Sequence, residues 1–237
     1  MSRQGAPTTA HGGAHVRVRR YSTFDRLNHW IVAVSFVALL LSGLSLFHPS
    51  LYWISGIFGG GAVVRWLHPW IGLVLAVSFI GLFVRFLWQN LPERTDIVWL
   101  ARIRDVLGAR EERLPEVGKY NAGQKFVFWA QAVLVSLLFV TGLGLWERGL
   151  PVIEGALGFK ATIDQVRIAA LLHAGAAVLA ITVWVLHVYA AIWVRGTFSA
   201  MTRGFVSGGW GWKHHRRWLR KEVGSGGVAP APMAPSE

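Results

Sequence analysis

The chain has 237 residues, of which 53% are hydrophobic and only 15% are charged. A soluble domain normally carries about 25% charged residues, so this composition predicts an integral membrane protein. The chain contains no Cys, which excludes disulfides, thiolate-bound iron–sulfur clusters and the C-x-x-C-H attachment of a c-type haem. Any haem must therefore be held without a covalent tether.

The two ends of the chain differ in composition from the rest. The first 16 residues are small and polar and lack the apolar run of a signal peptide. The last residues are rich in Gly, Ala and Pro. We therefore predict disordered tails over residues 1–20 and 223–237, with one membrane domain over residues 21–222 between them.

Four stretches of this domain contain no Asp, Glu, Lys or Arg. They are residues 30–47, 66–84, 126–146 and 168–194. Each is about long enough for a helix to cross a hydrocarbon core of about 30 Å. The fourth stretch is the longest, so it is expected to tilt or to project beyond the bilayer. The predicted fold class is all-α: an integral membrane bundle of four helices.

The Lys and Arg residues lie on one side of this topology. The N-terminal flank, the connection between the second and third stretches, and the C-terminal segment are all rich in Lys and Arg. The other two connections carry only Arg65, Arg148, Lys160 and Arg167. The positive-inside rule then places both termini in the cytoplasm. The net charge of +12 is interpreted as a topology signal with attraction to anionic lipids, and nucleic-acid binding is not predicted.

Three connecting segments have recognisable patterns. Residues 49–64 are apolar and Gly-rich, which predicts a short helix or re-entrant cap outside the membrane. Residues 96–107 have helical apolar spacing and predict an amphipathic helix on the cytoplasmic surface. Residues 198–218 mix three Trp residues with Lys, Arg and His, which predicts a second interfacial segment.

Four of the nine His residues lie within or at the edge of the predicted spans: His29, His68, His173 and His187. Imidazole in hydrocarbon is costly unless it is paired, so each is a candidate functional residue. His173 and His187 are 14 residues apart on one helix. At about 100° and 1.5 Å per residue, they face the same way and lie about 21 Å apart along the axis.

The direction of each span sets the depth of its His. His29 enters from the cytoplasmic side, and His68 enters from outside, three residues after Arg65. The fourth span runs inward, which places His173 near the outer face and His187 near the inner face. The predicted pairs are therefore His68 with His173 and His29 with His187.

Two imidazoles from different helices fill both axial positions of a haem iron, which favours electron transfer over oxygen binding. A catalytic zinc needs three protein ligands at one point, which two distant pairs cannot provide. Two other classes stay open. One is a transporter or proton channel with His relay groups, although the spans hold no Asp or Glu for such a relay. The other is a haem-free membrane anchor.

Five motifs around these residues resemble the gamma (cytochrome b) subunit of membrane-bound formate dehydrogenase, over roughly residues 20–222. They are R-L-N-H-W at 26–30, L-H-P at 67–69 followed by Gly72, G-K-Y-N-A-G-Q-K at 118–125, L-H-A at 172–174 and H-V-Y at 187–189. The G-K-Y-N-A-G-Q-K run together with the two His residues of the fourth span is specific. A single His in a helix would not be.

The resemblance implies more than the spacing does. It implies two haems b held by the four His residues, an iron–sulfur subunit that feeds the outer haem, and a molybdenum- or tungsten-pterin subunit that oxidises formate. The present chain would then contribute no catalytic residue of formate oxidation. The resemblance also implies a bacterial inner-membrane location.

The resemblance further implies a quinone reduced near the cytoplasmic face, with Asn121 and Gln124 in its pocket beside His187. Asn followed three residues later by Gln is also a helix-capping pattern, and both roles can hold together. The His residues alone equally fit the cytochrome b subunit of a hydrogenase or of a thiosulfate or polysulfide reductase, and the G-K-Y-N-A-G-Q-K run favours formate dehydrogenase.

Overall fold

The computed structural model describes residues 16–225 and 228–229. Four helices in it are long and apolar enough to cross a membrane, which confirms the predicted bundle. They are α1 (Thr23–Phe47), α2 (Gly61–Phe86), α5 (Ala122–Leu145) and α7 (Ile163–Trp193). The short 3-10 helix η2 (Leu87–Asn90) continues α2. As predicted, the fourth membrane helix is the longest, at 31 residues.

All four helices begin several residues before the uncharged stretches that predicted them. Three of them start with a capping box, in which two side chains satisfy backbone N–H groups that the first turn leaves free. The boxes pair Ser22 with Asp25, Asn121 with Gln124, and Thr162 with Gln165. The polar first turns therefore belong to the helices, although they lack the composition of a membrane span.

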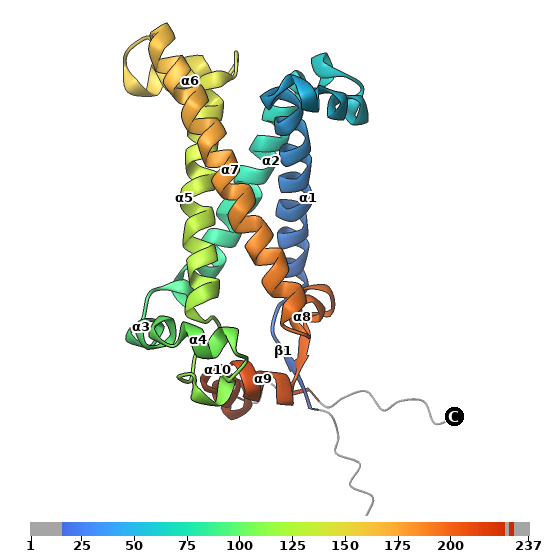
Figure 1. The fold of residues 1–237 in the computed structure, drawn as a ribbon, viewed down its shortest axis with the longest axis vertical. Coiled ribbons are helices and arrows are strands. Elements are labelled where there is room, and N and C mark those ends of the chain that lie inside the picture. The colour runs from blue at the N-terminus through green and yellow to red at the C-terminus, as the bar shows by residue number, and fades with distance from the viewer. Residues whose placement is uncertain (1–15, 226–227, 230–237) are drawn as a thin grey trace, which may run out of the picture.

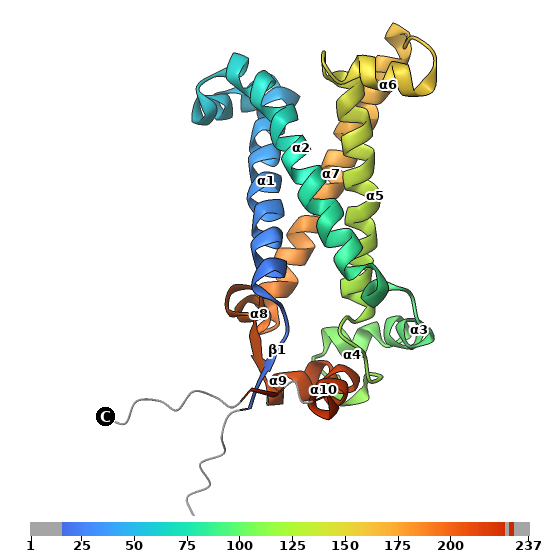
Figure 2. The same cartoon turned by 180° about the vertical axis from the view of Figure 1, so that it is seen from behind.

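The membrane helices form two antiparallel pairs (Figures 1 and 2). α1 packs mainly on α2, and α5 packs mainly on α7. The pairs diverge at the end that carries the short 3-10 helix η1 (Pro49–Phe58) and the short helix α6 (Leu150–Leu157), and α2 and α7 cross at mid-height (Figure 1). η1 agrees with the short helix predicted for residues 49–64.

The opposite end is covered by a cap of short elements (Figure 1). The strands of this cap are β1 (Arg17–Arg19), β2 (Phe205–Ser207) and β3 (Val228–Ala229). They form an antiparallel sheet in the order β2-β1-β3. Its helices are α3 (Arg94–Ala101), α4 (Ile103–Leu107), η3 (Glu111–Arg113), α8 (Thr197–Arg203), α9 (Gly208–His214) and α10 (Arg216–Gly224).

The single helix predicted for residues 96–107 is broken in the structure. Arg102 lies between α3 and α4 with a backbone that departs from the helical region, at φ −103° and ψ 27°. Asp96 and Trp99 are the buried residues of α3. Of the predicted apolar side, Ile97, Leu100, Ile103 and Leu107 face away from the protein and are exposed. Val106, also predicted on this side, is half-buried and packs against the cluster of Trp99, Val117 and Ala122. An outward apolar side is what a helix lying on a membrane surface requires.

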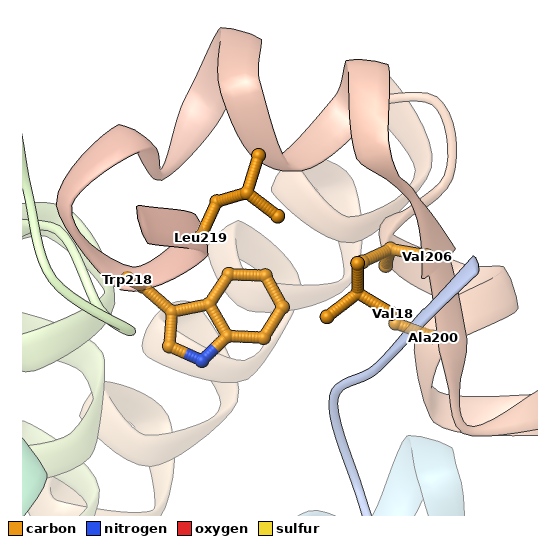
Figure 3. Close-up of a cluster of buried hydrophobic side chains, with 5 residues drawn as sticks. All are labelled: Val18, Ala200, Val206, Trp218 and Leu219. Carbon is orange, nitrogen blue, oxygen red and sulfur yellow. The ribbon is translucent and has the colours of Figure 1, made fainter. Parts of the chain in front are cut away.

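The structure places regular elements inside both predicted tails: β1 lies within residues 1–20, and the end of α10 and strand β3 lie within residues 223–237. Val18 is fully buried in strand β1, because alternate residues of a strand point to opposite faces. It packs in a small core with Ala200, Val206, Trp218 and Leu219 (Figure 3). Ordered structure therefore begins within the predicted tail 1–20 and extends into the predicted tail 223–237. Residues 1–15, 226–227 and 230–237 lie outside the described residues.

Candidate metal centres

The structure brings the four membrane His side chains together in the two expected pairs. The inner pair, near the cap, joins His29 of α1 to His187 of α7, with ring centroids 6.2 Å apart. The outer pair, nearer η1 and α6, joins His68 of α2 to His173 of α7, with centroids 6.4 Å apart. Helix α7 thus supplies one imidazole to each pair, and the α1–α2 pair supplies the other.

These separations fit a metal between two opposed imidazoles. Imidazole nitrogen lies about 2 Å from a bound transition metal and about 1 Å from the centre of its own ring, which places opposed ring centroids about 6 Å apart. Among residues 16–225 and 228–229, no group of three or more His, Cys, Asp and Glu could hold a metal ion. Two opposed imidazoles at each site could fill both axial positions of a haem iron.

Hydroxyl groups contact both imidazoles of the outer pair. Ser42 Oγ lies 2.8 Å from His68 Nδ1, and Thr141 Oγ1 lies 2.9 Å from His173 Nδ1. Ser42 is fully buried, and Thr141 is nearly so. The sequence analysis did not identify either residue. The available signal was a hydroxyl residue followed by Gly in both the first and the third span.

Those glycines lie directly against the same imidazoles. A Cβ atom added to Gly43 would lie 3.3 Å from His68 Cε1, and one added to Gly142 would lie 3.2 Å from His173 Cε1. Ordinary carbon–carbon contacts are about 3.5–4.0 Å. Glycine at these positions therefore gives each His ring room beside the neighbouring helix.

The inner pair has different surroundings. His29 Nδ1 is buried, and no group in the described part of the chain hydrogen-bonds to it. The preceding Asn28 donates from Nδ2 to the carbonyl of Ser78 at 3.0 Å, which fixes α1 to α2 beside this pair. The two pairs therefore share their ligand type and spacing but differ in the polar groups around the rings.

Asn121 and Gln124, the predicted quinone-pocket residues, cap the first turn of α5. Asn121 Oδ1 accepts from the backbone N–H of Gln124 at 3.0 Å, and Gln124 Oε1 accepts from the backbone N–H of Asn121 at 3.0 Å. The capping role is confirmed. The side-chain oxygens are occupied in this way, and the amide N–H₂ groups are the remaining donors. A contact with quinone stays a prediction.

A buried ion pair lies at the next turn of the same helix. Lys125 Nζ lies 2.8 Å from Asp96 Oδ2 of α3 and 3.7 Å from Glu93 Oε1. Lys125 and Asp96 are both buried, and Arg217 of α10 also pairs with Glu93. These charges join the cap to the start of α5.

A second buried cation holds the cap together. Arg20 is 5% exposed, and its guanidinium lies 4.8 Å from the ring centres of both Trp210 and Trp218. It also donates to the carbonyl of Lys119 at 2.6 Å and lies 3.2 Å from His215 Nε2. Aromatic faces are favourable surroundings for a cation that has left water. Arg20 thereby joins the N-terminal strand to two distant segments.

Burial changes the acid–base properties of the residues around Arg20. Burial and the positive charge of Arg20 lower the pKa of Lys119 to about 8. The same two causes lower the pKa of His215 to about 3. His215 Nδ1 lies 2.9 Å from the carbonyl of Gly118 and therefore donates to it as a neutral imidazole. This site is structural, and neither group lies in a membrane helix.

Known proteins resemble this chain over most of its length. Residues 20–204 match the family described as prokaryotic cytochrome b561. The chain is 41% identical over 202 residues to the cytochrome b556(fdo) subunit of formate dehydrogenase from Escherichia coli K12, covering 85% of this chain and 92% of that protein. It is 40% identical to the nitrate-inducible cytochrome b556(Fdn) subunit of the same organism, over 85% of this chain and 90% of that protein. The cytochrome b556 subunit of formate dehydrogenase from Haemophilus influenzae is 33% identical, over 87% of this chain and 84% of that protein.

Proposed function

The chain belongs to the prokaryotic cytochrome b561 family, as a membrane cytochrome b subunit of formate dehydrogenase, and on this premise we propose its path of electron transfer. The chain takes electrons from an iron–sulfur subunit at its outer end and delivers them to a quinone at its cytoplasmic end. Formate is oxidised in a third subunit with a molybdenum- or tungsten-pterin centre. The observation that carries this proposal is the pair of opposed imidazole sites on one helix.

The protein's task is to hold two redox sites at fixed depths. His68 and His173 would hold one haem b, and His29 and His187 would hold the other. Each bound haem would carry one electron at a time through its iron. The backbone of α7 sets the distance between the sites, at about 21 Å along the helix axis.

The quinone pocket is proposed at the start of α5. With their oxygens used in the capping box, Asn121 and Gln124 keep their amide N–H₂ groups as donors. A quinone carbonyl is an acceptor, so these donors suit it. Their position at the cap end of the bundle (Figure 1) would put proton uptake on the cytoplasmic side.

We also propose that the protein lies in the bacterial inner membrane with both termini in the cytoplasm. The support is the distribution of Lys and Arg, which concentrate in the cap and its flanking segments. Anionic lipids would then contact the basic cap. The inner end of the bundle, with the proposed quinone pocket, faces the cytoplasm in this orientation.

The same fold could serve a hydrogenase or a thiosulfate or polysulfide reductase. The four His residues do not separate these enzymes, because each requires only that electrons cross the bundle. The similarity to three formate dehydrogenase subunits along most of the chain favours formate dehydrogenase. Identification of the catalytic subunit that copurifies with this chain distinguishes these assignments.

A haem count tests the proposal directly. We expect two non-covalent haems b per chain, measured by the pyridine haemochrome assay, with low-spin bands in the reduced-minus-oxidised spectrum. Two variants, His68→Ala and His187→Ala, should each lose one haem. One haem in the unaltered chain would show that one pair is wrongly assigned. No haem in folded protein would reject the proposal in favour of an anchor or a proton relay.

A further inference from the structure

Two hydroxyl side chains occupy matching places in the two helix pairs. Ser42 of α1 reaches across to His68 of α2, and Thr141 of α5 reaches across to His173 of α7, at 2.8 and 2.9 Å from the respective Nδ1 atoms. Each hydroxyl residue precedes the glycine against which the same ring lies. The two imidazoles of the outer pair therefore have the same local surroundings, a hydroxyl group at Nδ1 and a glycine beside the ring.

The hydrogen positions follow from the other contacts of these hydroxyls. A hydroxyl has one hydrogen to donate and two lone pairs. Ser42 Oγ lies 2.7 Å from the carbonyl of Ala38, and Thr141 Oγ1 lies 2.6 Å from the carbonyl of Leu137. Each hydrogen is thus donated to the residue's own helix, and a lone pair faces the imidazole.

Each outer imidazole therefore carries its proton on Nδ1 and donates it to a hydroxyl. This tautomer leaves Nε2 unprotonated, which is the form that binds a metal. The hydroxyl is already polarised by its own hydrogen bond to a carbonyl, which makes it a better acceptor. At the inner pair, by contrast, no group of the described residues accepts from the buried Nδ1 of His29.

We infer that Ser42 and Thr141 are positioning residues that orient the outer imidazoles for ligation and lower the reduction potential of the outer site relative to the inner one. A ring that donates from Nδ1 becomes more basic, and a more basic ligand stabilises oxidised iron. The inference rests on the proposed function, because it requires that both pairs hold haem.

The inferred difference in reduction potential has the sign that the proposed electron path requires. Electrons move spontaneously from a site of lower potential to one of higher potential. A lower potential at His68 and His173 therefore favours transfer toward His29 and His187. Two uncharged hydroxyls would create this gradient without placing a carboxylate in the membrane, where a charge is costly.

Redox titration of the purified complex, followed by visible spectroscopy, tests the inference. The informative variants are Ser42→Ala, Thr141→Val and the double variant, since valine keeps the shape of threonine without its hydroxyl. Thr141→Ser keeps the hydroxyl. Ser136→Ala is a matched control on α5, because Ser136 Oγ donates to the carbonyl of Ala132 in its own helix at 2.7 Å. The outer haem is identified as the one that remains in a His29→Ala variant.

We expect the midpoint potential of the outer haem to rise in each single variant and further in the double variant, while the inner haem is unchanged. The Ser136→Ala and Thr141→Ser proteins should titrate like the unaltered complex. Loss of the outer haem from Thr141→Val, with retention in Thr141→Ser, would also support the positioning role.

Unshifted titrations in all variants, or equal shifts of both haems, would overturn the inference. If the unaltered complex holds two haems and reduces quinone, such a result rejects this inference and leaves the proposed function standing. Absence of haem from the unaltered complex would instead reject the proposed function, and the inference with it.

Discussion

Gly43 and Gly142 leave room for an imidazole ring against the helix backbone, which a side chain at either position would take up. The His68 and His173 rings lie so close to these backbones that an added Cβ would sit 3.3 or 3.2 Å from a ring carbon. The neighbouring helix cannot easily move away, because α1 packs mainly on α2, and α5 packs mainly on α7. The rings themselves would have to move, and with them their Nδ1 contacts to Ser42 and Thr141.

We predict that Gly142→Ala lowers the haem content from two to about one per chain, because displacement of His173 disturbs axial ligation. Gly144→Ala is the matched control. It lies two residues further along α5, about 200° around the helix, and an added Cβ there meets nothing within 4 Å. The pyridine haemochrome assay on both proteins gives the answer. Equal haem content in the two variants would contradict the prediction.

Sequence reasoning found the four His residues because imidazole in a membrane span is conspicuous. It missed Ser42 and Thr141 because a hydroxyl residue in a membrane helix usually bonds to its own backbone, as Ser136 does. Only the three-dimensional structure shows that these two hydroxyls also face Nδ1 atoms of a neighbouring helix.

Helix α3 is held by charge as well as by apolar contact. Its buried Asp96 accepts from Lys125 of α5 at 2.8 Å, and Trp99 packs with Val117 and Ala122. The outward side of α3 is apolar and exposed. A helix with apolar residues on both sides has no unique orientation from packing alone, so the buried ion pair selects which side faces the protein.

Removal of one partner of a buried pair leaves the other charge uncompensated, which costs about 3–5 kcal/mol. We therefore predict that Lys125→Met releases α3, seen as faster amide hydrogen exchange across residues 94–101. Removing both charges, in a double variant with Asp96→Leu, should restore part of the protection. Arg167→Ala serves as a control, because its pair with Asp164 is exposed and should contribute little. Unchanged exchange in Lys125→Met would show that apolar packing is sufficient.

The membrane helices were predictable because long uncharged stretches have few alternatives in a bilayer. The cap was not. The break at Arg102 leaves no mark in the apolar spacing, since Ile103 continues the pattern of Ile97 and Leu100. Strand β1 is only three residues long and pairs with β2 and β3, which lie about 190 and 210 positions away. No local pattern reveals such partners.

At the scale of the whole molecule, the two ends are chemically different. One end carries the cap. There Arg20, which follows strand β1, packs its guanidinium against the rings of Trp210 and Trp218. At the other end, the described part of the chain forms η1, α6 and short connections (Figure 2). Because Lys and Arg concentrate at the cap end, the proposed orientation follows from the distribution of charge over the entire chain.

The absence of Cys from the sequence makes this orientation simple to test. We predict that Lys160→Cys, in the exposed connection after α6, reacts with a membrane-impermeant maleimide in intact spheroplasts. Arg104→Cys, exposed in α4, should react only after permeabilisation. Labelling of both variants in permeabilised cells is the control for reactivity. The reverse pattern would invert the proposed topology.

Helix α7 carries one imidazole of each pair, so the length of the stretch between His173 and His187 sets the distance between the two pairs. One residue inserted there would turn one imidazole by about 100° relative to the other and shift it by about 1.5 Å, which would separate it from its partner ring. To keep both His pairs aligned, this segment can change its composition but not its number of residues. The number of residues between His173 and His187 therefore sets the spacing of the two proposed haem sites.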